Sequence, residues 1–263
     1  MAHGAEVDVR AITKRFGAVV AVEAVSFTVR AGEFFSLLGP SGCGKTTTLR
    51  AIGGFEAVDE GDILIGGRSM GRRPPNRRET NMVFQRLALF PHYSVLDNVA
   101  FGLKLRGVPR AEREKVARSW IKKVGLEGTE KKYPNQLSGG MRQRVAIART
   151  LAVKPQIILM DEPFGALDVQ TRLGMQNLIN ELWEEIEGTI LFVTHDIPEA
   201  VYLADKIHIL SACPGTIVEE ITVDLPLHRT EDLKTTQRFR ELETLVLQKI
   251  RHAARGGNVR ITT

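Results

Sequence analysis

Cysteine, long apolar runs and internal repeats are scarce or lacking in this sequence of 263 residues. Its two cysteines, Cys43 and Cys213, suit a reducing compartment and do not have metal-ligand spacing. No run approaches the roughly 18 consecutive apolar residues that a membrane span needs. The opening "MAHGAEVDVR" lacks the apolar region of a signal peptide, so we expect the protein to stay in the cytosol.

Charge alone identifies no partner. The net charge of +5 would allow nucleic acid or an anionic membrane surface as a partner, but the basic residues are mostly scattered. The exception is the segment Gly66–Glu79, which contains "GRSMGRRPPNRRE". Pro74 and Pro75 favour an exposed loop here over a binding patch.

The hydrophobic pattern predicts an α/β fold. Period-two alternation in "VDVRAI" and "AVSFTVRAG" predicts half-buried antiparallel strands, and the nearly continuous apolar "EFFSLLG" predicts a strand covered on both faces. A glycine loop and a helix, "GKTTTLRAIGGF", follow. From Ser94 to Leu151 the period is helical, which predicts a helical subdomain inserted at about residues 90–152.

The α/β core resumes after this insertion. "QIILMD" and "GTILFVTHD" are apolar strands with an amphipathic helix between them, and "DKIHILS" with "GTIVEEITVDL" predicts a hairpin around Pro214 and Gly215. We therefore predict one domain over residues 1–225 and a C-terminal helical extension over 226–263. The extension has one apolar helix stripe, formed by Phe239, Leu242, Leu245, Val246 and Ile250.

The loop "GPSGCGKTT" fits the pattern G-x-x-x-x-G-K-[ST] and lies between a strand and a helix. Glycines let backbone N–H groups curl around phosphate oxygens, and the helix N-terminus adds positive potential. Lys45 should reach the β- and γ-phosphates, and the Thr46 hydroxyl should ligate Mg²⁺, whereas Cys43 is a small loop filler. The predicted phosphate-binding residues are Gly39, Pro40, Ser41, Gly42, Cys43, Gly44, Lys45, Thr46 and Thr47.

Three polar residues end two of the predicted buried strands. Asp161 and Glu162 follow "IILM", at the carboxyl edge where parallel sheets bind ligands. Asp161 would hold Mg²⁺ through water, and Glu162 could orient or deprotonate the attacking water. His195, in "VTHD", could donate to a γ-phosphate, although an isolated histidine at a strand end is usually a surface residue.

A second glycine-rich helix start, "LSGGM" followed by "RQRVAIAR", resembles the signature of ATP-binding cassette (ABC) transporter ATPases. The resemblance runs from "ITKRFG" to about Val223, with the P-loop, "VFQ", "LSGGM", "IILMDEP", "GALD" and "VTHD" in the family's order. Met141 replaces the glutamine common at the end of the signature. The resemblance implies a P-loop NTPase core with an N-terminal antiparallel β-subdomain and an inserted α-helical subdomain.

The resemblance also implies ATP and Mg²⁺ as cofactors and a second copy of the chain as a partner. Each ATP would lie between one P-loop and the partner's signature, formed here by Ser138, Gly139, Gly140 and Met141, so that a two-fold dimer has two equivalent sites. Phe16 would stack on adenine, unless it is a buried turn residue. Gln85 would contact Mg²⁺ or water, and Asp168 would help couple the two sites.

By the same resemblance, the loop "FQRLALFPHYSV" would face integral-membrane permease subunits at the cytoplasmic face of the inner membrane, with a solute-binding protein as an indirect partner and no nucleic acid. Its apolar residues would form part of a groove for a coupling helix or would pack in the core. They are Leu87, Leu89, Phe90 and Tyr93.

The transported solute stays open at this point. One segment resembles the ATPases of importers of nitrate, sulfonate and taurine, namely "EAVYLADKIHILSACPGTIVEEITVDLP". The longer regulatory domain that is typical of sugar and polyamine importer ATPases is missing after it. A second segment looks equally like the polyamine and sugar group, namely "PPNRRETNMVFQRLALFPHYSVLDNVAFGL". A soluble ABC ATPase of DNA repair or translation is the competing class. Such proteins have coiled-coil insertions or two cassettes, and this chain has one cassette with a compact insertion. A P-loop kinase would not explain "LSGGM".

Overall fold

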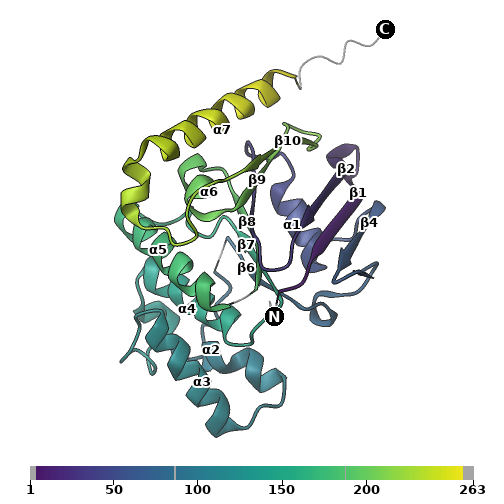
Figure 1. The fold of residues 1–263 in the computed structure, drawn as a ribbon. Coiled ribbons are helices and arrows are strands. Elements are labelled where there is room, and N and C mark those ends of the chain that lie inside the picture. Colours follow the sequence, from purple (N-terminus) through teal and green to yellow (C-terminus); the bar gives the residue numbers. More distant parts are fainter. Residues whose placement is uncertain (1–3, 86, 187, 257–263) are drawn as a thin grey trace.

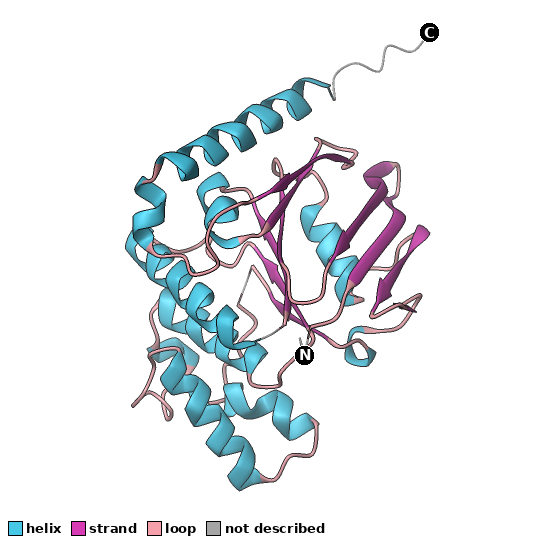
Figure 2. Cartoon of the chain, in the orientation of Figure 1, coloured by secondary structure: helices cyan, strands magenta, loops and turns pink. Residues whose placement is uncertain are grey.

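Two β-sheets and the helices around them make up the computed structural model, which describes residues 4–85, 87–186 and 188–256 (Figures 1 and 2). The smaller sheet has four antiparallel strands in the order β2-β1-β4-β5. Its first two strands confirm the predicted antiparallel pair, whereas the last two were not predicted. The strands are β1 (Val7–Phe16), β2 (Val19–Val29), β4 (Glu60–Ile65) and β5 (Arg68–Ser69).

The larger sheet has six strands in the order β10-β9-β3-β8-β7-β6. All neighbouring pairs are parallel except β9 and β10, which form the predicted hairpin. Because parallel strands end at the same edge, the residues that follow β3, β6, β7 and β8 are gathered there. The strands are β3 (Phe34–Leu38), β6 (Thr80–Val83), β7 (Ile157–Asp161), β8 (Thr189–Thr194), β9 (Lys206–Leu210) and β10 (Ile217–Thr222).

Both faces of the larger sheet are covered, as the continuous apolar strands predicted. Alternate residues of one strand enter different cores, so that Phe34 and Leu38 face one side and Phe35 and Leu37 the other. Helix α1 and the smaller sheet cover one face, and α4, α5 and α6 cover the opposite face. The helices are α1 (Lys45–Gly53), α4 (Gly139–Leu151), α5 (Val169–Ile186) and α6 (Ile197–Leu203).

The predicted helical insertion contains α2 (Val95–Leu105) and α3 (Arg110–Lys123), which pack against α4 at one end of the molecule (Figure 1). Ser94 caps α2 by accepting a hydrogen bond from the Asp97 N–H. No helix within the described residues combines the length and the apolar character required to span a membrane.

The C-terminal extension forms η3 (Glu231–Thr235) and the long helix α7 (Gln237–Gly256); residues 257–263 lie outside the described residues. Phe239, Leu242 and Val246 are buried as predicted, but Leu245 is 38% exposed. At about 100° per residue, position 245 points roughly a quarter turn away from the mean direction of that stripe. Its inclusion in the stripe was wrong.

Most of the basic segment Gly66–Glu79 is exposed, as predicted, but Arg78 is partly buried and has a structural contact. Its guanidinium donates to the carbonyl oxygens of Ala51 and Ile52, at 2.8 Å each, in the last turn of α1. Burial, together with the nearby Arg73, lowers the Arg78 pKa. Arg78 therefore satisfies C-terminal carbonyls of the helix that follows the P-loop.

Candidate active site

The Gly39–Thr47 loop joins β3 to α1 at the carboxyl edge of the larger sheet. The N-cap residue of α1, Gly44, has a φ of 92°, which favours glycine, and a Cβ there would lie 2.3 Å from Val22 Cγ1. Since glycine has no side chain to cap the helix, the first N–H groups of α1 suit an anionic ligand.

Lys45 is 4% exposed, and its ammonium lies across the loop. Its Nζ donates to the carbonyl oxygens of Gly39 at 2.8 Å and Pro40 at 2.9 Å. Phosphate oxygens could replace these acceptors with little movement of the lysine. Cys43 is buried beside it, and burial raises the pKa of its thiol, which agrees with a loop-filling side chain rather than a reactive one.

Thr46 and Asp161 meet between the loop and the end of β7, where Thr46 Oγ1 donates to Asp161 Oδ1 at 2.7 Å. Asp161 is 1% exposed, and burial raises its pKa, although the Thr46 hydrogen bond opposes the shift. A hydroxyl and a buried carboxylate are oxygen ligands of the kind that Mg²⁺ prefers, and a cation would offset the cost of burying the charge. This pair therefore fits a magnesium site.

Glu162 has an unusual backbone conformation, with a φ of 43°. For a residue with a side chain this region is strained, and such strain concentrates at functional sites. The Glu162 N–H donates to Val193 O at 2.9 Å, which ties the turn to β8.

Gln85 and His195 contact the same carboxylate oxygen of Glu162. Gln85 Nε2 donates to Glu162 Oε2 at 3.2 Å, and His195 Nδ1 lies 3.3 Å from it. Three predicted residues from the ends of β6, β7 and β8 are thus brought together. Gln85 therefore lies at Glu162, and its predicted contact with Mg²⁺ or water stays a prediction.

Phe16 lies at the end of β1 and is 48% exposed, so it is not a buried turn residue. The Lys14 ammonium is 5.2 Å from its ring centroid, and the exposure of Phe16 leaves part of the aromatic surface open. Such a surface can stack on a planar base.

The signature residues belong to α4, on the face of the larger sheet opposite α1. Ser138 caps α4 by accepting from the Met141 N–H at 3.3 Å. A Cβ at Gly139 would meet nothing within 4 Å, whereas one at Gly140 would lie 2.4 Å from Thr171 Cγ2. Gly139 is thus open to a ligand or partner, and Gly140 is required by packing. The structure does not bring this helix start to the P-loop.

Asp168 caps α5 through its neighbour Thr171. The Thr171 N–H donates to one Asp168 carboxylate oxygen at 3.0 Å and the hydroxyl to the other at 2.7 Å. These hydrogen bonds lower the pKa of Asp168, which is exposed. Asp168 is therefore rigidly held at the surface close to the signature.

The apolar residues that follow Gln85 divide between surface and core. Leu89 packs partly buried against the main core, whereas Phe90 is 37% exposed and its ring is tilted against that of Phe101, with 4.3 Å between the centroids. Asn98 fixes this segment by donating to the carbonyl oxygens of Phe90 and Tyr93. Leu89 therefore packs in the core, whereas a coupling-helix groove that includes the exposed Phe90 stays a prediction.

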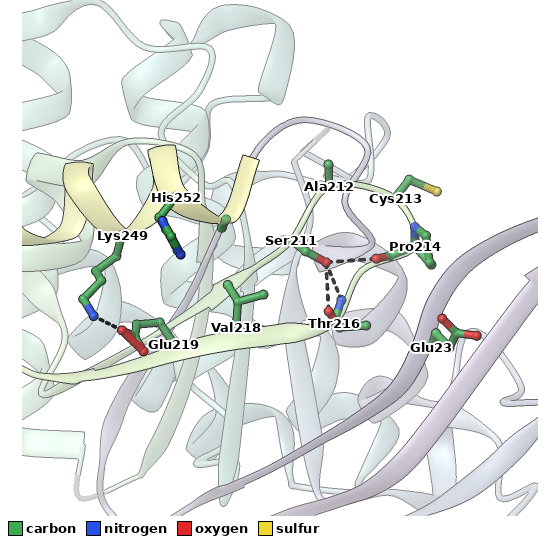
Figure 3. Close-up of a pocket in the computed structure, with 11 residues that line it drawn as sticks. Glu23, Ser211, Ala212, Cys213, Pro214, Thr216, Val218, Glu219, Lys249 and His252 are labelled. Carbon is green, nitrogen blue, oxygen red and sulfur yellow. Dashed lines mark hydrogen bonds and ion pairs between the residues drawn. The ribbon is translucent and has the colours of Figure 1, made fainter. Parts of the chain in front are cut away.

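A cavity of about 370 Å³ lies outside this site, between α7 and the β9–β10 hairpin (Figure 3). Lys249 of α7 and Glu219 of β10 form an ion pair on one wall, and Ser211 bonds to Thr216 and Pro214 at the other end. This cavity was not predicted from the sequence.

The model of the ABC transporter family matches residues 22–165. The chain belongs to the ABC transporter family. It is an ATP-binding, ATP-hydrolysing member, and the ABC ATPase fold expected from the sequence is confirmed.

Relatives at similar identity carry different names. An uncharacterised ABC transporter ATP-binding protein of Methanocaldococcus jannaschii is 50% identical over 81% of this chain and 79% of its own length. The taurine import ATP-binding protein TauB of Escherichia coli strain K12 is 43% identical over 89% and 93%. The spermidine/putrescine import ATP-binding protein PotA of Rubrobacter xylanophilus is 49% identical over 79% of this chain, which spans 57% of that relative.

Solved structures of ABC cassettes superpose on this fold. The cassette MJ0796, as a dimer in a post-hydrolysis state bound to ADP and Pi, has a TM-score of 0.72 and 35% identity, over 84% of this chain and all of that one. A second dimeric structure of MJ0796 has a TM-score of 0.75 and 34% identity over the same shares.

Proposed function

We propose that this ABC ATPase couples the hydrolysis of Mg²⁺-bound ATP to solute import through a membrane permease. The observation that carries the proposal is the meeting of Gln85 and His195 on the Glu162 carboxylate, beside the Thr46–Asp161 pair. Together these side chains would supply a base, two positioning groups and a cation site at one edge of the sheet.

In this proposal the Gly39–Thr47 loop binds the ATP phosphates, and Lys45 exchanges its carbonyl acceptors for β- and γ-phosphate oxygens. Thr46 would hold Mg²⁺ directly and Asp161 through water. When bound, the cation supplies positive charge that offsets the charge of the phosphates. Chelation with EDTA should abolish ATP hydrolysis, and added Mg²⁺ should restore it; hydrolysis that survives chelation would contradict the site.

Glu162 would accept the proton of the attacking water. One oxygen of its carboxylate is contacted by Gln85 and His195, and the other would face the attacking water. His195, which is largely exposed, would donate to the γ-phosphate from the same turn. ATP hydrolysis and ATP binding by Glu162→Gln test these assignments.

We propose a head-to-tail dimer as the active form. Helices α1 and α4 begin on opposite faces of the larger sheet. One nucleotide would therefore be bound between the P-loop of one copy and the signature of another. The open space at Gly139 supports this, since its missing side chain is not explained by packing in the single chain. Phe16 would stack on the adenine, and Asp168 would lie at the interface between copies.

We propose a small organic or inorganic anion of the nitrate, sulfonate or taurine kind as the solute. The hairpin resemblance supports it, as does the alignment with TauB, which covers 89% of this chain against 79% for PotA. The ATPase domain would span residues 1–225 and act at the cytoplasmic face of the membrane, with permease subunits as partners and a solute-binding protein as an indirect one. The alternative is a polyamine- or sugar-type importer.

Uptake assays in a strain deleted for this gene distinguish the two solute classes. We expect loss of taurine, sulfonate or nitrate uptake with normal polyamine and sugar uptake, and the reverse pattern would overturn the solute assignment. Fractionation tests the importer class itself. A chain that never sediments with membranes or co-purifies with a hydrophobic permease would favour a soluble ABC ATPase.

A further inference from the structure

Arg172, in the first turn of α5, lies between the loop that carries Asp168 and the turn that carries His195. Its Nη2 donates to Leu167 O at 3.2 Å. Its Nη1 lies 3.7 Å from the Asp196 carboxylate and its Nε 3.8 Å from the Glu199 carboxylate. One planar guanidinium thus spans two segments that both border the catalytic site.

The turn on the far side of Arg172 is closed by its own hydrogen bonds. Thr194 Oγ1 donates to Glu199 Oε2 at 2.7 Å and accepts from the Asp196 N–H at 3.0 Å, while Asp196 caps α6 by accepting from the Glu199 N–H at 3.0 Å. His195 lies within this closed unit. A displacement of Glu199 or Asp196 therefore moves the histidine as well.

Glu199 is 5% exposed, so its charge depends on a nearby cation. Arg172 Nε is buried and makes no hydrogen bond among the residues that the structure describes. The Nε–Glu199 distance of 3.8 Å is too long for a hydrogen bond, and a shift of about 1 Å would create one. The contact is therefore one that can open or tighten.

The same groups border the catalytic carboxylate. A small cavity is lined by Arg172 and Glu199 together with Glu162 and His195. Since His195 Nδ1 lies only 3.3 Å from Glu162 Oε2, a shift of the histidine turn changes the position of the catalytic carboxylate.

At its other end, the first turn of α5 touches the signature helix. A Cβ on Gly140 would lie 2.4 Å from Thr171 Cγ2, and the two Asp168 hydrogen bonds hold the Thr171 side chain in that position. Movement at the start of α4 is therefore passed to Thr171 and to its neighbour Arg172.

We propose that Arg172 and Glu199 are positioning residues. They would pass a movement of the signature, caused by its contact with nucleotide, to Glu162 and His195 of the same chain. The proposal rests on the head-to-tail dimer proposed above, in which the signature of one copy contacts the nucleotide hydrolysed by the other. The contact between Arg172 and Glu199 then couples the two nucleotide sites of the dimer. Binding of ATP at one site thus determines the position of the catalytic carboxylate at the second site.

The test uses Arg172→Met, Glu199→Gln and the double variant, with ATP hydrolysis measured against ATP concentration. We expect each single variant to lower the maximal rate about tenfold and the Hill coefficient toward 1, while ATP binding to the monomer is unchanged. The double variant should be no worse than either single one, since the pair acts as a unit. Arg172→Lys should restore little of the hydrolysis rate or the cooperativity, because an ammonium cannot bridge the same groups.

Arg229→Met is the matched control. Arg229 is also a buried arginine, donating to Tyr202 O and Ala204 O at the opposite end of α6 and paired with Asp205. At a temperature where it is folded, this variant should keep the wild-type rate and Hill coefficient despite lower stability. A general effect of removing a buried guanidinium would instead appear in both arginine variants and overturn the proposal.

Two further outcomes would overturn it. One is unchanged cooperativity in Arg172→Met, and the other is additive losses in the double variant. If wild-type protein dimerises with ATP and hydrolyses it cooperatively, these results reject only the transmission between sites. If wild-type protein does neither, the dimer proposal fails as well.

Discussion

Lys45 is the residue for which an effect on ATP binding can be measured separately from an effect on the rate of hydrolysis. Its ammonium is buried and donates to carbonyl oxygens of the loop that is predicted to bind the phosphates. Lys45→Ala should weaken ATP binding by about 1.5–3 kcal/mol, roughly ten- to a hundredfold in Kd. Equilibrium binding of a fluorescent ATP analogue measures this. An unchanged Kd would remove Lys45 from the phosphate site.

His208 should make the free energy of unfolding depend on pH. It is 3% exposed on β9, and burial lowers its pKa below about 6.5, with Lys206 acting in the same direction and Glu220 opposing. The unfolded chain therefore binds the proton more tightly, so stability falls as the pH drops through about 6.5 toward the folded-state value.

Replacing His208 by phenylalanine should remove this dependence, because the ring would pack against Phe27 and Phe35 without a titrating group. Urea unfolding at pH 7.5 and pH 5.5 measures it, both pH values being about one unit from the ordinary histidine pKa. The wild-type chain should lose more stability than His208→Phe between the two, and equal losses would contradict this reading.

At the residue scale, the sequence predicted which side chains form the site but not how the backbone places them. Lys45, Asp161 and Glu162 follow from strand–loop patterns alone. The φ of 43° at Glu162 and the packing of Gly140 on Thr171 depend on segments distant in sequence. Roles for Arg172 and Glu199 were not predicted. The only indication in the sequence is that a charged residue follows "GALD" and "VTHD" within a few positions.

Among the secondary-structure elements, the β9–β10 hairpin supports the P-loop directly. The Gly215 N–H donates to Ala21 O and its carbonyl accepts from the Glu23 N–H, both at 3.0 Å. A Cβ on Gly215 would lie 2.0 Å from Cys43 O, inside the phosphate-binding loop. The hairpin thus fixes the P-loop and β2 relative to each other.

Gly215→Ala should displace the P-loop, weaken ATP binding and cost about 1–3 kcal/mol of stability through overpacking. Gly174→Ala in α5 is the control, since a Cβ there would lie 3.9 Å from Arg144 Nη2, an ordinary van der Waals contact, and alanine favours a helix. Thermal unfolding and ATP titration of both variants check this. Normal ATP binding by Gly215→Ala would show that the hairpin does not support the loop.

Periodicity predicted the long elements well and the short ones poorly. The apolar strands β3, β7 and β8 and the helices α2 to α5 fall where their patterns placed them. Strands β4, β5 and β6 were missed because none of them has the nearly continuous apolar run of β3, β7 and β8 or a long alternating pattern. Leu245 was misplaced because an apolar residue at helix spacing need not face the core.

At the scale of the whole molecule, we expect a monomer that dimerises when ATP is bound, because each composite site needs groups from two copies. Light scattering with and without ATP measures the mass. Gly139→Asp should block dimerisation without unfolding the chain, since a Cβ there meets nothing within 4 Å and the added charge would repel phosphate. A permanent dimer indifferent to nucleotide would contradict the model.

The central claim is that Glu162 is the base of ATP hydrolysis in such a dimer. Glutamine in place of Glu162 keeps the shape of the side chain but cannot accept the proton of water. Phosphate release and equilibrium ATP binding by Glu162→Gln should show hydrolysis reduced about 10²–10⁴-fold, ATP binding retained and the ATP-bound dimer accumulating. Hydrolysis at close to the wild-type rate would show that the catalytic assignment is wrong.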